Sequence, residues 1–371
     1  MADRKTIPLK IQNLLWARAA GRCEFEGCNH DLTSELLTQD TENEGQIAHI
    51  IAASQKGPRG TEDSANLQDK IENLMLLCPE HHKLIDGDNR TKYTVDCLRE
   101  MKRKHEERID LATGISPEKQ SLIVLYTSSI GTKIPNISKK EAVDAMFPVF
   151  YPTANSPIDL SEKSPLEDNQ QNYWTIETFT LKVKFEKQLA NIIESGVSNI
   201  SLFAIAPQPM LVYLGTLFGD IQKVSVYQKH REPDTWRWLD PESDNSFSIK
   251  EPEDKSGKPV LVFSISAKNI ETRIREMYKE GESIWIVTCN EPNNDMLVSP
   301  KQLSEFRTCA RKVLDDINTS SSSDCIKVHM AMPVACAVEF GRVRMPKADK
   351  AWVLYDYHRD TETELETITI Q

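Results

Sequence analysis

The sequence has no apolar run long enough to cross a membrane, since no stretch of 18 apolar residues occurs among its 371 residues. Its first residues, MADRKTIPLK, also lack the apolar segment of a secretion signal. We therefore expect a cytoplasmic protein with no membrane partner. In that compartment the eight cysteines are expected to be thiols or metal ligands rather than disulfides.

An excess of positive charge is also missing, which bears on any nucleic-acid partner. The net charge is −11; residues 1–110 contain 16 Lys and Arg against 20 Asp and Glu, a net charge of −4 that leaves −7 for the rest. Neither part is a basic domain, so the free chain should capture DNA weakly. This counts against constitutive, tight DNA binding.

The length of the chain and a linker near residue 115 indicate more than one domain. A chain of 371 residues is expected to fold into two or three domains. Apolar residues in 5–20 have helical spacing, and a charged helix is expected from Thr94, a good N-cap, to about Gly114. The linker TGISPEK follows. We therefore place the domains at 1–115 and 116–371.

In the second domain, short apolar runs alternate with helical segments. This is the pattern of a parallel or mixed α/β sheet. The candidate strands are SLIVLY (121–126), ISLFAIA (200–206), KVSVY (223–227), PVLVFSI (259–265), SIWIVTC (283–289), IKVHMAM (326–332) and KAWVLYDY (350–357). We therefore predict an α/β fold for this domain.

An internal repeat connects two of these strand–helix–strand units. Residues 200–227 and 326–355 both run from a strand through a proline to a helix with a glycine, and on to a strand ending at a tyrosine. The proline and the glycine are eight residues apart in both copies, and the copies are 126 residues apart. Chance similarity is the alternative. We favour a duplicated Rossmann-like half, which predicts a pseudo-symmetric pair with a crevice between its members.

Two short-spaced pairs of metal-binding residues lie in the first domain. Cys23 and Cys28 form one pair, and Cys78 and His81 form the other about fifty residues later. Zinc prefers four such ligands in a tetrahedron, and a small domain with few large apolar residues gains from a metal core. These residues predict a structural zinc ion. His30 is a competing ligand for His81, and buried, unligated cysteines are the alternative.

Three polar residues are interleaved with these pairs in a distinctive order. His49 lies in the strand-like run AHII, Asn73 follows 24 residues later, and His82 comes directly after His81. With both metal-ligand pairs in this interleaving, the segment from about residue 16 to 110 resembles the HNH endonuclease family, above all in NLMLLCPEHHKLID. The resemblance implies an α+β, zinc-stabilised ββα-metal nuclease domain.

The resemblance also implies roles for these residues. Phosphodiester hydrolysis needs a base near neutral pH and a hard cation on the scissile phosphate. His49 would be the general base, and His82 would bind the catalytic cation, Mg²⁺ or another divalent ion. Asn73 would either bind that cation or orient the base. Many members have an acidic metal ligand just before the first histidine; this chain has Ala48, so another side chain or a water would have to replace it.

The loop KGPRG offers two basic side chains near this site. Lys56 and Arg59 are candidate phosphate contacts, because flexible glycines let a backbone approach DNA. Two solvated loop charges are the alternative.

The second domain resembles a family of ligand sensors. The segments LFAIAPQPMLVYLGTLF and VHMAMPVACAVEFGRV, each followed by a strand, carry the resemblance to the SAVED domain. That domain is a fusion of two Rossmann-like (CARF-like) halves that binds cyclic oligonucleotides in bacterial CBASS anti-phage defence. The resemblance implies a cyclic di- or trinucleotide as activator.

Ligands of Rossmann-like sheets bind beyond the carboxyl ends of the strands, where helix N-termini favour phosphate. Trp236 and Trp238 could stack on a base, although two tryptophans at period two more often share one face of an edge strand. The candidate ligand contacts are Gln208, Pro209, Lys229, Arg231, Trp236, Ser266 and Asn290.

The two resemblances together predict an HNH–SAVED effector endonuclease. We expect a homo-oligomer, a dimer at rest and a tetramer or larger when activated, that degrades double-stranded DNA during abortive infection once the ligand fills the crevice. Two other classes stay open. One is a modification-dependent restriction endonuclease, against which the acidic second domain counts. The other is a non-catalytic, zinc-stabilised DNA-binding module, in which His49 would have no role.

Overall fold

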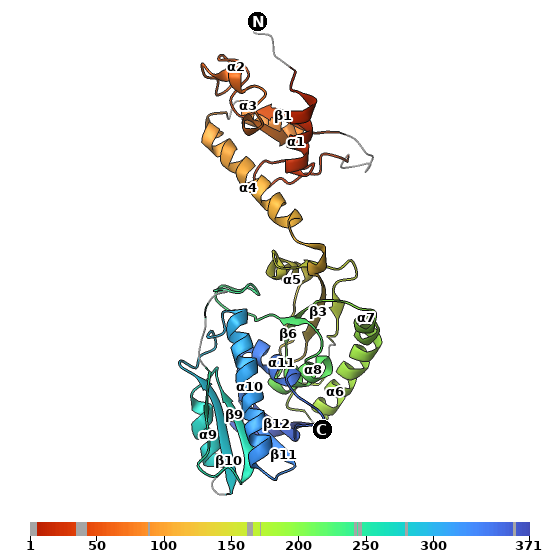
Figure 1. The fold of residues 1–371 in the computed structure, drawn as a ribbon, viewed down its shortest axis with the longest axis vertical. Coiled ribbons are helices and arrows are strands. Elements are labelled where there is room, and N and C mark those ends of the chain that lie inside the picture. Colours follow the sequence, from red (N-terminus) through yellow and green to blue (C-terminus); the bar gives the residue numbers. More distant parts are fainter. Residues whose placement is uncertain are drawn as a thin grey trace. The chain divides into compact units, whose positions relative to one another are not determined.

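The structure is a computed structural model that describes residues 6–34, 43–87, 90–161, 166–170, 172–240, 243, 247–278, 281–358 and 361–371. The chain divides into two compact units, Met1–Ser116 and Pro117–Gln371, here called the N-terminal and C-terminal units (Figure 1). The division falls one residue after the boundary placed from the sequence. No helix among the described residues is long and apolar enough to span a membrane.

The N-terminal unit is built around one β-hairpin and a helix. Strands β1 and β2 pair antiparallel, with His49 opposite Leu74, and α3 follows directly, which confirms the ββα order. The elements of the unit are α1 (Leu9–Ala19), β1 (Gln46–His49), α2 (Ser64–Leu67), η1 (Ile71–Asn73), β2 (Leu74–Leu77), α3 (Pro79–Asp86), η2 (Arg90–Lys92) and α4 (Val95–Thr113).

Local signals explain where these helices begin. The Thr94 side chain accepts a hydrogen bond from the Cys97 backbone N–H (3.2 Å), so α4 begins where the sequence predicts. Helix α3 begins with Pro79, at a position whose N–H would have no partner within the helix. The buried apolar residues that pack between these elements are aliphatic side chains, two methionines and two cysteines. So small a core leaves the unit dependent on further cross-links.

The C-terminal unit is an α/β structure with two sheets. Its elements are η3 (Pro117–Lys119), β3 (Gln120–Thr127), α5 (Lys139–Met146), β4 (Tyr151–Pro152), β5 (Ile158–Asp159), α6 (Tyr173–Lys184), η4 (Phe185–Ala190), α7 (Asn191–Glu194), β6 (Ile200–Ile205), α8 (Gln208–Phe218), β7 (Val224–Val226), β8 (Phe247–Lys250), β9 (Lys258–Ser264), α9 (Asn269–Met277), β10 (Glu282–Cys289), α10 (Pro300–Ser320), β11 (Cys325–Ala331), α11 (Val334–Arg342), β12 (Ala351–His358) and β13 (Thr363–Ile370).

The two sheets correspond to two Rossmann-like halves. One has the order β4-β3-β6-β7 with β5 also on β3, and its pairs are parallel. The other has the order β13-β12-β11-β9-β10-β8, parallel in the centre and antiparallel at both edges. All seven strands expected from the sequence are present.

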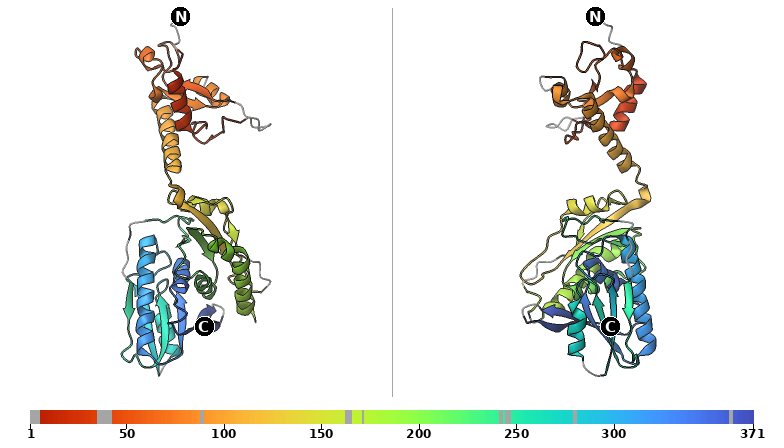
Figure 2. Two further views of the ribbon diagram at one scale, coloured as in Figure 1. Left: turned by 45° about the vertical axis from the view of Figure 1, so that its right-hand side comes forward. Right: turned by 90° about the vertical axis from the view of Figure 1, so that its left-hand side faces the viewer.

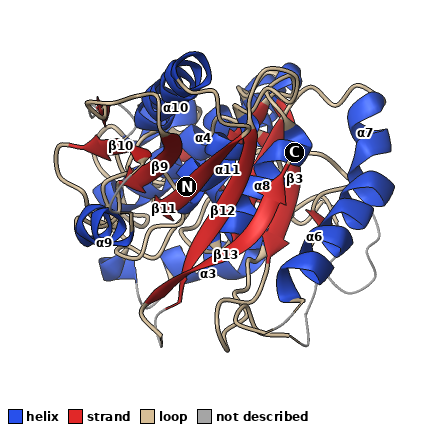
Figure 3. Cartoon of the chain, turned by 90° about the horizontal axis from the view of Figure 1, so that it is seen from below, coloured by secondary structure: helices blue, strands red, loops and turns tan. Residues whose placement is uncertain are grey.

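Helices α8 and α11 lie side by side between the two sheets (Figure 3). Helix α10, light blue in Figure 2, runs along the six-stranded sheet and contributes to the same core. The predicted repeat is visible in the fold: β6–α8–β7 and β11–α11–β12 are both units with parallel strands. The pseudo-symmetric pair of halves is therefore confirmed.

The glycines of the repeat lie where α8 and α11 cross. A Cβ atom on Gly215 would lie 2.1 Å from the Val338 carbonyl oxygen, and one on Gly341 would lie 2.0 Å from the Val212 carbonyl oxygen. Backbone atoms cannot yield as flexible side chains do, so any side chain at these two positions forces the helices apart. Both copies of the repeat therefore have a glycine at the place where α8 and α11 touch.

We expect Gly341→Ala to destabilise the C-terminal unit. Overpacking typically costs about 1–3 kcal/mol and more where only backbone is in the way, so the unfolding midpoint should fall by several degrees. Differential scanning calorimetry of the full chain measures this. Thr216→Ala is the control, because the Thr216 hydroxyl donates to Tyr213 within α8 itself. A Gly341→Ala protein with the wild-type midpoint would refute this account of the crossing.

Candidate functional site

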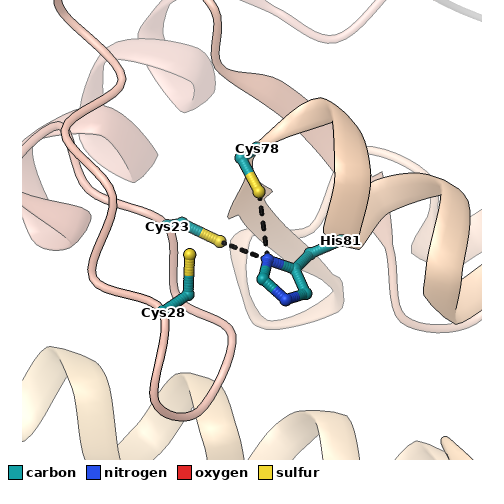
Figure 4. Close-up of side chains that lie close together, drawn as sticks. All are labelled: Cys23, Cys28, Cys78 and His81. Carbon is teal, nitrogen blue, oxygen red and sulfur yellow. Dashed lines mark hydrogen bonds between the residues drawn. The ribbon is translucent and has the colours of Figure 1, made fainter. Parts of the chain in front are cut away.

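Four metal-binding side chains of the N-terminal unit converge on one point. Figure 4 shows the thiols of Cys23, Cys28 and Cys78 pointing toward the imidazole ring of His81. Their ligand atoms all lie within 4.8 Å of one another, and His81 Nδ1 is 3.0 Å from Cys78 Sγ and 3.8 Å from Cys23 Sγ. Around a tetrahedral zinc ion with Zn–S bonds of about 2.3 Å and Zn–N bonds of about 2.0–2.1 Å, a nitrogen ligand and a sulfur ligand are about 3.6 Å apart. The cluster therefore fits a zinc site.

The protonation of this cluster depends on a cation. Burial raises the pKa of the Cys23 thiol to about 12, and burial also raises the pKa of Cys78. Burial lowers the pKa of His81, so its ring is neutral. A divalent cation bound here would displace the thiol protons and take the sulfurs as ligands.

The competing ligand His30 lies outside this group. Its Nε2 atom is 3.2 Å from Glu44 Oε2, so it belongs to a different contact. The ring of Phe25 stacks on that of His81, with centroids 4.0 Å apart, and so holds the imidazole in place. Of the two histidines left open by the sequence, the structure brings His81 to the cysteines.

His49 lies at the end of β1, where its ring contacts a backbone carbonyl. Its Nε2 atom is 2.9 Å from the backbone carbonyl oxygen of Gln68. A neutral ring that donates Nε2–H to this oxygen has Nδ1 as its unprotonated, basic nitrogen. Sequence reasoning missed Gln68, because its contact is through a backbone carbonyl, which any residue type carries.

Asn73 is buried and bonded to the backbone. Its Oδ1 atom accepts a hydrogen bond from Ile51 N (2.8 Å), and its Nδ2 atom donates to the oxygens of Ile51 (2.8 Å) and Leu67 (3.2 Å). The amide thereby ties the segment after His49 to the start of β2. Of the two roles left open for Asn73, this geometry supports orienting the base over binding a cation.

His82 is the second residue of the adjacent pair on α3. The ring of His81 faces the cysteines, and His82, half-buried, lies about 100° further around the helix. Helix α3 packs on β1, which ends with His49. One helix thus carries a ligand of the cysteine cluster and the predicted ligand of the catalytic cation.

The two loop cations have different environments. Lys56 is exposed. The side chain of Arg59 is only 9% exposed, and it donates hydrogen bonds to the Ile50 and Ile85 carbonyls and to Asp86. DNA contact is therefore not the role that this geometry supports for Arg59. The glycines around it had suggested an open loop.

In the C-terminal unit, the two halves meet at the N-termini of α8 and α11. Gln208, the first residue of α8, accepts a hydrogen bond from Met332 N (3.3 Å) in the other half, and Pro209 beside it is buried. Gln228 is buried and accepts from Ala335 N (3.2 Å) in α11. The sequence did not single out Gln228, because a lone glutamine after a strand belongs to no motif.

Two of the predicted ligand contacts are engaged elsewhere. Trp236 is 2% exposed and packs edge-on against Phe203 in the core, so it offers no face to a base. The Lys229 ammonium lies 2.5 Å from Asp234 and 3.7 Å from Glu141, so its charge is balanced within the protein. For these residues the structure supports a packing role.

The other predicted contacts lie at or near the surface. Arg231 and Asn290 are exposed. Ser266 is half-buried, and its backbone N–H donates to the Ala331 carbonyl (2.7 Å), next to the end of β11. Trp238 is partly buried against the core. Of the predicted contacts, Gln208 and Ser266 thus form hydrogen bonds with the residues at the carboxyl end of β11, Met332 and Ala331.

Two family models match the chain. Residues 181–369 match the model of SAVED, the "SMODS-associated and fused to various effectors sensor domain". Residues 23–87 match the model of HNH endonuclease, and the Cys–His cluster, His49, Asn73 and His82 all lie within that range. No curated protein matches the chain.

Several solved structures resemble the chain distantly. They include the Cap4 SAVED/CARF-domain containing receptor of Acinetobacter baumannii with the cyclic trinucleotide 2'3'3'-cAAA (12% identity, TM-score 0.41, covering 83% of this chain and 66% of that one). The Cap4 receptor of Moraxella osloensis has 10% identity and a TM-score of 0.39, with coverages of 84% and 66%. The chain thus spans just under two thirds of the length of these receptors.

Proposed function

Because the chain belongs to the SAVED family and carries an HNH endonuclease domain ahead of its sensor, we propose that it is a cytoplasmic, divalent-metal-dependent endonuclease. It degrades double-stranded DNA when a cyclic di- or trinucleotide binds. An HNH nuclease fused to a SAVED sensor has the composition of a CBASS effector, so abortive infection is the proposed outcome. The observation that carries the proposal is the His49 ring held by Gln68 at the end of β1.

In the nuclease site, His49 is the general base. With Nε2–H donated to Gln68, the ring takes the proton of the attacking water at Nδ1. The cation, Mg²⁺ or another divalent ion, supplies charge neutralisation on the scissile phosphate and the leaving oxygen. His82 is its proposed ligand. Asn73 keeps the segment after His49 in place through its bonds to Ile51.

The cysteine cluster has a structural role in this proposal. Cys23, Cys28, Cys78 and His81 would hold one zinc ion, joining the turn after α1 to the N-terminus of α3. All four positions of a tetrahedron are then protein ligands, which is the arrangement of a structural rather than a catalytic zinc site. His82 is placed by the same helix, so the zinc ion supports the catalytic centre from outside it.

The activator binds between the halves of the sensor. The N-termini of α8 and α11 each bond to the opposite half in this region, and helix N-termini favour the phosphates of a cyclic nucleotide. Gln208 already bonds across to the second half. The proposed contacts are Gln208, Pro209, Arg231, Ser266 and Asn290.

Activation proceeds through assembly. The first 110 residues have a net charge of −4, so one copy binds DNA poorly. Joining several weak binders raises their effective concentration on one duplex without adding a basic residue. We propose a dimer at rest and a tetramer or larger assembly with ligand, in which two nuclease sites cut both strands.

A plasmid assay tests this function. Supercoiled plasmid, a divalent cation and the protein are incubated with each member of a panel of cyclic di- and trinucleotides. We expect linear and then degraded DNA with one or a few members, and intact plasmid without nucleotide or with EDTA. Gln208→Ala should abolish the response, whereas Gln188→Ala, at an exposed position on η4, should not.

Each of the other outcomes of this assay contradicts the proposal or favours another function. Full cleavage without nucleotide contradicts gating by the sensor. Cleavage restricted to modified DNA indicates a modification-dependent restriction endonuclease. DNA binding without cleavage under every condition indicates a zinc-stabilised binding module.

A further inference from the structure

The turn after β1 folds one arginine back into the protein. Ala52 N donates to the Pro58 carbonyl (3.2 Å), and Gly60 N donates to that of Gly57 (3.1 Å). A Cβ atom on Gly57 would lie 2.5 Å from Ala52 Cβ, and one on Gly60 would lie 2.5 Å from the Gln55 carbonyl oxygen. Between them, Arg59 has a φ of +57°, an uncommon conformation for a residue with a side chain. This tight turn directs the side chain inward.

The guanidinium of Arg59 joins two elements of the nuclease unit. Toward β1, its Nε donates to the Ile50 carbonyl oxygen (2.6 Å). Its Nη2 donates to the backbone carbonyl oxygen of His49 (3.4 Å). Toward α3, its Nη1 donates to the Ile85 carbonyl (2.8 Å) and its Nη2 to Asp86 Oδ1 (2.6 Å). The side chain is 9% exposed, so these bonds are largely shielded from water.

Both ends of this bridge lie beside predicted catalytic residues. The β1 end is the backbone of His49 and its neighbour. The α3 end is the last turn of the helix, three residues beyond His82. The final carbonyls of a helix have no partner within it and attract a cation, so Arg59 both satisfies Ile85 and fixes the helix end.

We propose that Arg59 is a positioning residue that sets the placement of His49 relative to His82. It does so through the backbone of β1 and the end of α3, and it does not contact DNA. This rests on the nuclease function proposed above and adds to it a residue outside the His–Asn–His set. The planar fork of the guanidinium reaches acceptors on two elements at once, which the single ammonium of a lysine does not.

Arginine-to-lysine exchange separates positioning from phosphate contact. Arg59→Lys keeps the charge and loses the fork, and Arg59→Ala loses both. Arg99→Lys, at an exposed position of α4, is the matched control. The full-length variants are compared for zinc content, thermal unfolding, kcat and KM with activated protein, and the salt dependence of DNA binding. Amide hydrogen exchange of residues 48–52 and 82–87 provides a readout that needs no activity.

Positioning predicts that Arg59→Lys keeps its zinc and its fold but loses about 10–100-fold in kcat, the usual cost of removing a residue that orients a metal-site ligand. KM and the salt slope of DNA binding should stay at wild-type values, and exchange should rise in both segments. Arg59→Ala should show the same pattern with a larger loss.

Three results would overturn the proposal. They are wild-type kcat in Arg59→Lys, unchanged exchange in both segments, or a loss confined to KM with a salt slope reduced by about one, which marks a lost phosphate contact. If the wild type cleaves no DNA, the proposed nuclease function fails, while hydrogen exchange still decides whether Arg59 holds the two elements together.

Discussion

Replacing His49 with alanine is expected to lower DNA cleavage by about 10²–10⁴-fold, the usual loss when a general base is removed. The change removes the nitrogen that accepts the proton of the attacking water. It leaves the Cys–His cluster, the Asn73 bonds and the whole sensor unit untouched, because the His49 side chain contributes to none of them. Zinc content, nucleotide binding and DNA binding should therefore be those of the wild type.

Single-turnover cleavage of a labelled duplex by activated protein measures this loss directly. His30→Ala is the matched control, since His30 is a histidine of the same unit whose ring pairs with Glu44. It should retain cleavage. An active His49→Ala protein would move the catalytic role to another residue and would favour the zinc-stabilised binding module.

The second large effect concerns the Cys–His cluster. Cys78→Ala should abolish zinc binding and unfold the N-terminal unit while the C-terminal unit stays folded. The buried apolar core of the N-terminal unit is small, and structural zinc in zinc-finger peptides contributes about 10–16 kcal/mol of folding free energy. The C-terminal unit has its own extensive core and does not depend on this ion.

Two measurements test this expectation. Elemental analysis should find about one zinc ion per wild-type chain and none in Cys78→Ala. Limited proteolysis of the variant should degrade residues 6–116 and spare residues 117–371. Cys97→Ala, a half-buried cysteine of the same unit outside the cluster, should behave as wild type. A wild-type protein that is folded without zinc would contradict the structural role.

The strands that the sequence predicts contain short apolar runs. The central strands β9, β10 and β11 are nearly continuous apolar runs, and such runs are recognisable without neighbours. The antiparallel edges β8 (FSIK) and β13 (TELETITI) were not predicted. In both strands polar residues alternate with apolar ones, because one face of the strand is more exposed than the other, and in the sequence this resembles a loop.

Among the site residues, the metal-ligand cluster was predictable from the sequence and the direction of Arg59 was not. The spacing of Cys23, Cys28, Cys78 and His81 predicts their convergence, because two short-spaced pairs of this kind are the usual pattern of zinc ligands. The direction of Arg59 depends on one backbone conformation, a φ of +57°, which no pattern of residue types encodes. A sequence therefore suggests which groups are chemically competent more reliably than which way they point.

The tryptophans show the same limit. Trp236 and Trp238 alternate as an edge strand would, and either could have faced a ligand. In the structure Trp236 stands edge-on to Phe203, and its position in the core follows from the packing of helices and strands distant in sequence. Burial of this kind depends on tertiary contacts and not on local periodicity.

The most direct test of the account joins ligand, assembly and cleavage in one titration. Multi-angle light scattering and plasmid cleavage are followed on the same preparation while the active cyclic nucleotide is added. We predict that mass rises from dimer to tetramer or larger at the nucleotide concentrations that start cleavage, and that Gln208→Ala loses both responses together. Cleavage that begins while the mass stays constant, or that runs at full rate without nucleotide, would contradict activation through ligand-driven assembly.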